Sequence, residues 1–321
     1  MKKKRSKDMK LVIIEPLGVQ KDLLLEMAAK ALPDDVEVVY YDTKVTDTPT
    51  LIERGKDADI IAVSNLPLNA DVIRGCENIK MLSVAFTGVD HIALDACREK
   101  GVIVSNCAGY STAAVADLVF GMIIDLYRNV IACNDVVRKG GTKDGLIGYE
   151  LEGKTFGIIG TGAIGMRVAK IADAFGCKVL GFNRSRKESD IIRFVDKETL
   201  LRESDIISLH TPLTSETKGL IGEDELKLVK PSAILINTSR GPVVDSKALA
   251  DALNEGRLAG AGVDVFEKEP PLAEDHPLLT AKNVVATPHI GFATKERLIK
   301  RAVIVFDNIA AWINGQPINL I

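Results

Sequence analysis

The sequence has few of the residues that mark several classes of protein. Aromatic residues make up 5% of its 321 residues, and there is one tryptophan. The five cysteines are odd in number and contain no C-x-x-C pair, so neither a disulfide framework nor a cysteine metal site is expected. The formal net charge is −3, which argues against an extended nucleic-acid surface.

Long apolar runs are also missing. No stretch is long enough to span a bilayer, and the N-terminus, with a basic run at residues 2–7, lacks the apolar core of a signal peptide. We interpret the basic run as a solvated tail and the cysteines as reduced, mostly buried thiols. We therefore expect a cytoplasmic protein without membrane or nucleic-acid partners and without a metal.

Strand-like and helical segments alternate along the chain in two series. In the first series, β-rich segments lie at residues 10–15, 36–41, 59–64, 81–85 and 102–104. In the second they lie at residues 155–159, 178–182, 206–210, 233–237, 260–265 and 283–286. Strands that alternate with helices form parallel sheets covered on both faces. The sequence thus predicts an α/β protein with two doubly wound parallel-sheet domains, a Rossmann cofactor domain and a smaller flavodoxin-like substrate domain, with a cleft between them.

The segment between the two series is helical in pattern. Apolar residues continue on more than one face from Ser111 to about Arg138, which predicts one long helix buried on several sides. It is either a core helix of one domain or a link between domains that also contributes to a subunit interface. The last helix, near residues 294–314, has no strand after it, so we expect it to return to the first domain. The predicted domains are a discontinuous substrate domain, residues 1–106 plus 291–321, and a dinucleotide-binding domain, residues 107–290.

A glycine-rich turn follows the strand at residues 155–159. Gly160, Gly162 and Gly165 form G-x-G-x-x-G between this strand and a helix. The first glycine permits the turn, the second lets a pyrophosphate approach the backbone, and the third lets the helix lie against the strand. The sequence predicts a dinucleotide site here, at the N-terminus of the helix.

The residue that usually contacts the ribose indicates which dinucleotide binds. An acid about twenty residues after the turn usually binds the ribose hydroxyls, but Asn183 stands there, followed by Arg184 and Ser185. A carboxylate would repel a 2′-phosphate, asparagine does not, and a guanidinium binds phosphate through two hydrogen bonds. NADP(H) is therefore favoured, with NAD(H) as the alternative; a solvated basic turn at residues 184–187 is the competing explanation.

Three residue types at strand ends suit one reaction. His289 follows the last predicted strand, Arg240 follows the strand at residues 233–237, and glutamates follow the strand at residues 260–265. Reduction of a 2-keto acid needs a cation for the carboxylate, a proton donor for the forming alkoxide, and an anion that keeps the donor protonated. The alternative explanation is a set of structural ion pairs. The other histidines, His91, His210 and His276, have structural explanations.

Five motifs resemble the D-isomer-specific 2-hydroxyacid dehydrogenase family over nearly the whole chain. They lie at residues 157–165, 210–214, 236–241, 262–270 and 287–291. The resemblance implies that Arg240 binds the substrate carboxylate and polarises the carbonyl. It also implies that His289 is the general acid/base and that Glu269 hydrogen-bonds the imidazole and raises its pKa.

The resemblance implies further contacts. The backbone N–H groups of Gly88 and Val89 would receive the substrate carboxylate, and Asp264 would hold the nicotinamide amide. The expected cofactor-binding residues are Thr112, Gly160, Gly162, Ala163, Ile164, Gly165, Asn183, Arg184, Ser185, His210, Thr211, Pro212, Thr238, Asp264 and His289. A homodimer joined through the cofactor domains is expected.

The predicted function is hydride transfer between NAD(P)H and a small 2-keto acid or D-2-hydroxy acid, with glyoxylate or hydroxypyruvate as the model substrates. A first alternative is 3-phosphoglycerate dehydrogenase. A second is an NAD(H)-sensing binding protein that resembles the C-terminal binding protein corepressors. The substrate side chain is expected to contact residues 65–69, Phe86 and Phe292.

Overall fold

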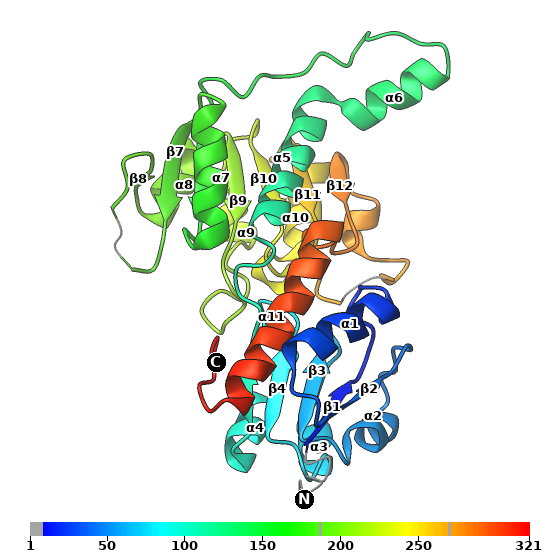
Figure 1. The fold of residues 1–321 in the computed structure, drawn as a ribbon. Coiled ribbons are helices and arrows are strands. Elements are labelled where there is room, and N and C mark those ends of the chain that lie inside the picture. The colour runs from blue at the N-terminus through cyan, green and yellow to red at the C-terminus, as the bar shows by residue number, and fades with distance from the viewer. Residues whose placement is uncertain (1–8, 186–187, 269–270) are drawn as a thin grey trace, which may run out of the picture. The chain divides into compact units, whose positions relative to one another are not determined.

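The chain divides into two compact α/β units. A computed structural model describes residues 9–185, 188–268 and 271–321. The first unit combines the chain up to Ser111 with Thr294–Ile321, and the second is Thr112–Ala293. Each unit contains one sheet whose strands all pair in parallel (Figure 1). The predicted fold class, two doubly wound parallel-sheet domains, is confirmed.

The first unit has a five-stranded sheet in the order β2-β1-β3-β4-β5. Its strands are β1 Met9–Ile13, β2 Val36–Tyr40, β3 Ile60–Val63, β4 Met81–Val84 and β5 Ile103–Ser105. Its helices are α1 Lys21–Ala31, α2 Thr48–Gly55, α3 Ala70–Gly75, α4 Leu94–Lys100 and α11 Lys295–Ile313. Every residue of β3 and β4 is buried, because helices cover both faces of a parallel sheet. The strand order is that of flavodoxin-like folds.

Helix α11 belongs to the first unit although it lies at the other end of the chain. It packs against α1 and β4. The buried Arg301 donates to the carbonyl of Leu17 at 2.7 Å, and the buried Asn308 donates to the carbonyl of Asn106 at 2.9 Å. These contacts join the C-terminal helix to loops near the two ends of the first unit's N-terminal segment.

The second unit has a seven-stranded sheet in the order β12-β11-β10-β9-β6-β7-β8. Its strands are β6 Thr155–Ile159, β7 Lys178–Phe182, β8 Arg193–Phe194, β9 Ile206–Leu209, β10 Ile234–Asn237, β11 Gly260–Val263 and β12 Val284–Ala286. The chain runs outward from β6 in one direction and returns to build the other side from β9. Ligands of such sheets bind at the carboxyl ends of the strands where the order reverses. Strand β8 was not predicted, because two residues are too short for a pattern.

Helices cover both faces of this sheet. The helices of the unit are α5 Thr112–Arg128, α6 Val130–Arg138, α7 Ala163–Ala174, α8 Lys197–Glu203, α9 Glu223–Leu226 and α10 Ser246–Asn254, with 3₁₀ turns η1 Gly241–Val243 and η2 Pro277–Leu279; α6 does not lie on the sheet. Helix α5 packs on α7 and on β10, β11 and β12. Its apolar residues join Phe156 and Ile158 of β6 in one hydrophobic core. A second core occupies the other face, against α8 and α10.

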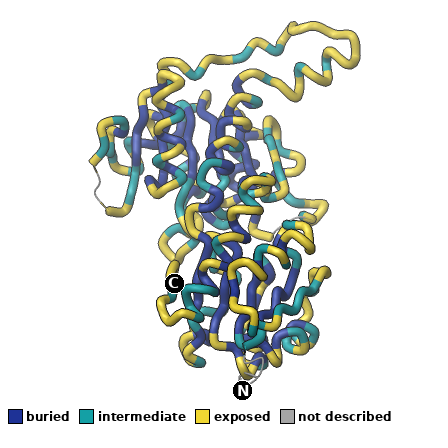
Figure 2. Tube along the Cα trace, in the orientation of Figure 1, coloured by how far each residue is buried: buried dark blue, intermediate teal, exposed yellow. Residues whose placement is uncertain are grey.

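The prediction of one long helix from Ser111 to Arg138 is wrong. Helix α5 ends at Arg128, Asn129 adopts a left-handed backbone with φ 52°, and α6 starts in a new direction. Burial on several sides holds for α5 only, since α6 has no buried residue and exposes Val130, Ile131 and Val137 (Figure 2). The apolar pattern of the sequence continues past Asn129 into α6, but the buried surface that such a pattern predicts ends with α5.

Two further features bear on the sequence predictions. Four of the five cysteines are buried, as predicted, and Cys133 is half-buried. Within the described ranges, no helix combines the length and the apolar character needed to cross a bilayer.

Candidate active site

The glycine turn between β6 and α7 is packed against backbone on one side and open on the other. Gly160 has φ +95°, and a Cβ there would lie 2.6 Å from the carbonyl oxygen of His210. A Cβ on Gly165 would lie 2.1 Å from the carbonyl oxygen of Gly160. A Cβ on Gly162 would meet nothing within 4 Å. Gly162 precedes α7 and has no side chain to cap it, so the first N–H groups, at Ala163 and Ile164, can bind an anion.

Asn183 fixes the turn that follows β7. Its Oδ1 accepts a hydrogen bond from the backbone N–H of Thr161 at 3.3 Å. Its Nδ2 donates to the carbonyl oxygen and the hydroxyl of Ser185, at 3.0 and 2.9 Å. A carboxylate at this position would accept from Thr161 but could not donate to Ser185. Asparagine therefore links the glycine turn to the next strand end and leaves no negative charge there.

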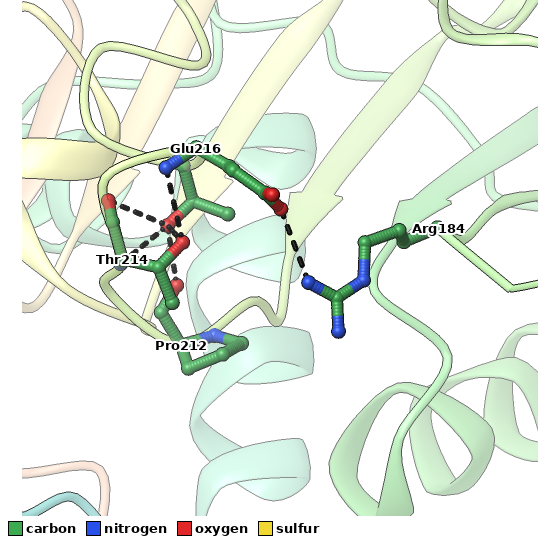
Figure 3. Close-up of polar contacts among 5 residues, drawn as sticks. Arg184, Pro212, Thr214 and Glu216 are labelled. Atoms are coloured by element: carbon green, nitrogen blue, oxygen red, sulfur yellow. Dashed lines mark hydrogen bonds and ion pairs between the residues drawn. The ribbon is translucent and has the colours of Figure 1, made fainter.

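Arg184 has an acidic partner that the sequence did not indicate. Its Nη1 lies 3.1 Å from Oε2 of Glu216, a residue of the loop after β9 (Figure 3). Both side chains are exposed, at 86% and 66%. The other basic residues of the predicted turn, Arg186 and Lys187, lie outside the described residues.

The loops after β9 and β10 carry buried hydroxyls. The Oγ1 atoms of Thr211 and Thr238 are buried, and neither has a hydrogen-bond partner among the residues that the structure describes. Buried polar atoms are rarely left in this state. Thr211 follows β9, which pairs with the strand of the glycine turn, and Thr238 follows β10, the strand beyond it, so their hydroxyls fit a polar ligand at this edge. Pro212, also predicted as a contact, is exposed on the same loop.

His210 is held as a neutral imidazole. Its Nε2 lies 2.9 Å from the hydroxyl of the buried Ser208. Burial lowers the pKa of His210 to about 3, because the charged form would lose its hydration. The backbone carbonyl of His210 packs against Gly160 of the glycine turn, and its neutral imidazole adds no charge to the site.

This pKa predicts a loss of stability in mild acid. The folded-state pKa of His210 lies below the ordinary value of 6.5, so the unfolded chain takes up a proton that the folded chain does not. Stability should therefore fall as pH falls from about 6.5 towards 3. Without cofactor, we expect the free energy of unfolding to be about 1–2 kcal/mol lower at pH 5 than at pH 7 from this group. Urea unfolding of the native protein and of His210→Gln at both pH values measures this difference. If the free energy of unfolding depends on pH in the same way in the two proteins, His210 is not its source.

Asp264 organises the loop that carries His289. The backbone N–H of His289 donates to the carbonyl of Asp264 at 2.8 Å, and His289 itself adopts φ +55°. The Asp264 carboxylate accepts from the Thr287 hydroxyl at 2.6 Å and from the N–H groups of Ile290 and Gly291, each at 2.8 Å. Burial raises the pKa of Asp264, and these hydrogen bonds, together with His289, only partly offset the effect. The sequence predicted a ligand contact for Asp264 but not these three hydrogen bonds, by which its carboxylate holds the turn that carries His289.

The backbone after β10, which carries Arg240, touches the backbone after β11. Asn237 donates to the carbonyl of Arg240 at 3.0 Å, and Arg240 donates to the carbonyl of Ser239 at 2.8 Å. A Cβ on Gly241 would lie 2.0 Å from the carbonyl carbon of Phe266, so only glycine allows this approach. The segment from Phe266 leads towards Glu269, which lies outside the described residues.

One further acid and one further base of this region pair with each other. Glu267, the first glutamate after β11, pairs with His276 at 3.2 Å. Burial raises the pKa of Glu267, but hydrogen bonds from Ser246 and His276 outweigh it and hold this pKa below its usual range. His276 thus has the structural role expected from the sequence.

Most predicted cofactor contacts lie at one edge of the second unit's sheet. The glycine turn, Asn183, Thr211, Thr238 and Asp264 all follow the carboxyl ends of strands, and His289 follows β12. Thr112 begins α5 in the same unit. Gly88 and Val89 lie in the first unit, in the loop between β4 and α4, where both are half-buried. The ring of His289 meets Phe292 edge-on at 5.5 Å.

The chain is similar to known dehydrogenases over most of its length. Residues 120–291 match the family model described as D-isomer specific 2-hydroxyacid dehydrogenase, NAD binding domain. A glyoxylate reductase from Thermococcus litoralis is 41% identical over 88% of this chain and 89% of the relative. A hydroxypyruvate reductase from Blautia hydrogenotrophica is 36% identical over 88% of this chain and 91% of the relative.

A solved structure agrees with these relatives. An acyclic imino acid reductase in complex with NADPH and D-Arg superposes with a TM-score of 0.89, at 32% identity, covering 98% of this chain and all of the other. The comparisons favour the reductase prediction over the phosphoglycerate dehydrogenase and corepressor alternatives. The chain thus belongs to the D-isomer-specific 2-hydroxyacid dehydrogenase family and is an oxidoreductase that uses a nicotinamide cofactor.

Proposed function

We propose that this protein reduces a small 2-keto acid of the glyoxylate or hydroxypyruvate class to the corresponding D-2-hydroxy acid, with NADPH as the preferred cofactor. The observation that carries the proposal is the set of three hydrogen bonds by which Asp264 holds the turn that carries His289. A histidine held in left-handed backbone at a strand end is costly unless the surrounding structure fixes it. Reductases of glyoxylate and hydroxypyruvate among the relatives support the substrate class.

Each residue of the set has a proposed role. Arg240 pairs with the substrate carboxylate and polarises the keto group, and the N–H groups of Gly88 and Val89 bind the carboxylate. A bound nicotinamide would supply the hydride. His289 donates a proton to the alkoxide oxygen as the negative charge forms, and Glu269 keeps the imidazole protonated until then.

The two units are proposed to have different roles, cofactor binding in the second and substrate binding in the first. The second, which contains the glycine turn and the matched residues 120–291, would be the dinucleotide-binding domain at residues 107–290. The first would be the substrate domain, at residues 1–106 plus 291–321. The buried hydroxyls of Thr211 and Thr238 support a polar ligand in the second unit.

The preference for NADP(H) over NAD(H) rests on the end of β7. Asn183 provides no carboxylate to repel a 2′-phosphate, and its hydrogen bonds to Ser185 hold the turn from which Arg184 projects. An imino acid reductase of the same fold was solved with NADPH. A charge-assisted hydrogen bond contributes about 1.5–3 kcal/mol, so we expect kcat/KM for NADPH to exceed that for NADH by roughly 10–100-fold.

One spectrophotometric panel tests substrate and cofactor together. Glyoxylate, hydroxypyruvate, pyruvate and 3-phosphohydroxypyruvate are each offered with NADPH and with NADH. The proposal expects the highest kcat/KM with glyoxylate or hydroxypyruvate and NADPH. A preference for 3-phosphohydroxypyruvate would replace the proposed substrate, equal or better use of NADH would overturn the cofactor preference, and no turnover with any acid would favour a binding protein.

We also propose a homodimer of the cytoplasm. Val130, Ile131 and Val137 on α6 are exposed by 50–69%, and Ile147 and Tyr149 in the segment after it by 86% and 63%. This part of the chain extends from the body of the second unit (Figures 1 and 2). Several apolar side chains on one projecting segment suit burial against a second copy. A monomer in sedimentation velocity at micromolar concentration would contradict it.

A further inference from the structure

We propose that Glu216 is a specificity-determining residue that opposes the 2′-phosphate at Arg184 and so limits the preference for NADPH. The inference rests on the cofactor preference proposed above and adds a residue that acts against it. Glu216 competes for the guanidinium in the free protein and repels the phosphate in the complex.

The two residues approach from loops on either side of the glycine turn. Arg184 follows β7, Glu216 lies after β9, and both strands pair with β6. In Figure 3 the guanidinium and the carboxylate point towards one another. The distance between Nη1 and Oε2 is 3.1 Å. The carboxylate therefore lies beside the group that we propose as the phosphate ligand.

The loop that carries Glu216 is closed by its own hydrogen bonds. The Thr217 hydroxyl donates to the carbonyl of Pro212 at 2.6 Å and accepts from the N–H of Thr214 at 2.8 Å. The N–H of Glu216 donates to the Thr214 hydroxyl at 3.3 Å. These bonds fix the backbone from which the carboxylate extends. On the other side, Asn183 fixes the backbone next to Arg184.

The effect of the pair is on the ligand rather than on the fold. Both side chains are more than half exposed, so the pair contributes little to stability. A guanidinium has donors left when one nitrogen faces a carboxylate, so the phosphate can still bind. It would then lie within several ångströms of a like charge, and that repulsion is felt only by cofactors with a 2′-phosphate.

The experiment measures binding without catalysis. Adenosine 2′,5′-bisphosphate carries the 2′-phosphate, and 5′-AMP lacks it. Isothermal titration at low salt compares both ligands on the native protein and on Glu216→Gln, which keeps the size of the side chain and removes its charge. We expect affinity for the bisphosphate to rise about 3–10-fold and affinity for 5′-AMP to change less than about twofold. The gain should shrink at high salt. The NADPH to NADH ratio of kcat/KM should rise in parallel.

A matched control is available on the opposite edge of the same sheet. Arg193 and Glu203 also form an exposed Arg–Glu pair, but beside Thr155 and Lys178 at the amino ends of β6 and β7. Glu203→Gln removes the same charge from the same unit. It should leave the affinities for both nucleotides unchanged, whereas a general effect of net charge would raise the bisphosphate affinity in both variants.

Arg184→Gln separates failure of this inference from failure of the proposed cofactor preference. If Arg184→Gln leaves bisphosphate affinity unchanged, the phosphate does not bind at Arg184 and the cofactor assignment fails. If Arg184→Gln weakens binding but Glu216→Gln leaves it unchanged, Glu216 does not repel the phosphate. If both weaken it, Glu216 orients Arg184 for the phosphate, and the sign proposed here is wrong.

Discussion

His289→Ala is expected to lower kcat for 2-keto acid reduction by roughly 10²–10⁴-fold, the usual contribution of a general acid. His289 follows β12, and Asp264 holds the turn around it with hydrogen bonds to Thr287, Ile290 and Gly291. The variant removes the proton donor and leaves these three bonds in place. Stopped-flow reduction with saturating NADPH measures the chemical step, and wild-type kinetics would remove His289 from its proposed role.

The backbone of His289 calls for a second variant. Its φ of +55° is tolerated better by histidine and asparagine than by alanine, so His289→Ala changes conformational strain as well as chemistry. His289→Asn keeps the backbone preference and has no group that titrates near neutral pH. Equal losses in the two variants would assign the effect to proton transfer. Recovery of activity in His289→Asn alone would mean that the shape of the turn matters and the imidazole does not.

The sequence predicted features that depend on local patterns. Gly160, Gly162 and Gly165 were identified from their spacing, and Gly160 and Gly165 each meet a backbone requirement of the turn in the structure. The strands were found because buried parallel strands are nearly continuous apolar runs: β3 is wholly apolar, and β4, β9 and β10 are each broken by one polar residue.

Features that join distant segments, or that depend on the backbone conformation of a single residue, were not predictable from the sequence. The ion pair between Arg184 and Glu216 links loops 32 positions apart, and no periodicity relates them. The break at Asn129 depends on one left-handed residue inside a pattern that remains apolar on both sides. Asp264 was identified from a motif, but its three hydrogen bonds to the His289 turn depend on how β11 and β12 lie side by side.

Gly162→Ala is expected to weaken binding of the cofactor while leaving the fold intact. A Cβ at this position meets nothing within 4 Å in the protein, and φ −72° is allowed for alanine. The methyl group would stand where the second glycine of the motif lets a pyrophosphate approach. A forced contact of this kind costs about 1–3 kcal/mol, so the dissociation constant for NADPH should rise roughly 10–100-fold. Fluorescence titration measures it.

Gly165→Ala should act differently, because its Cβ would lie 2.1 Å from the carbonyl oxygen of Gly160. The turn itself must then shift, and both the free energy of unfolding and NADPH affinity should fall. Gly121→Ala is the matched control: it lies exposed within α5, with nothing within 4 Å of the added carbon, and should be neutral or stabilise by up to about 1 kcal/mol. If Gly162→Ala binds NADPH as tightly as the native protein, the pyrophosphate does not approach this turn, and the dinucleotide site must be sought at another part of the sheet edge.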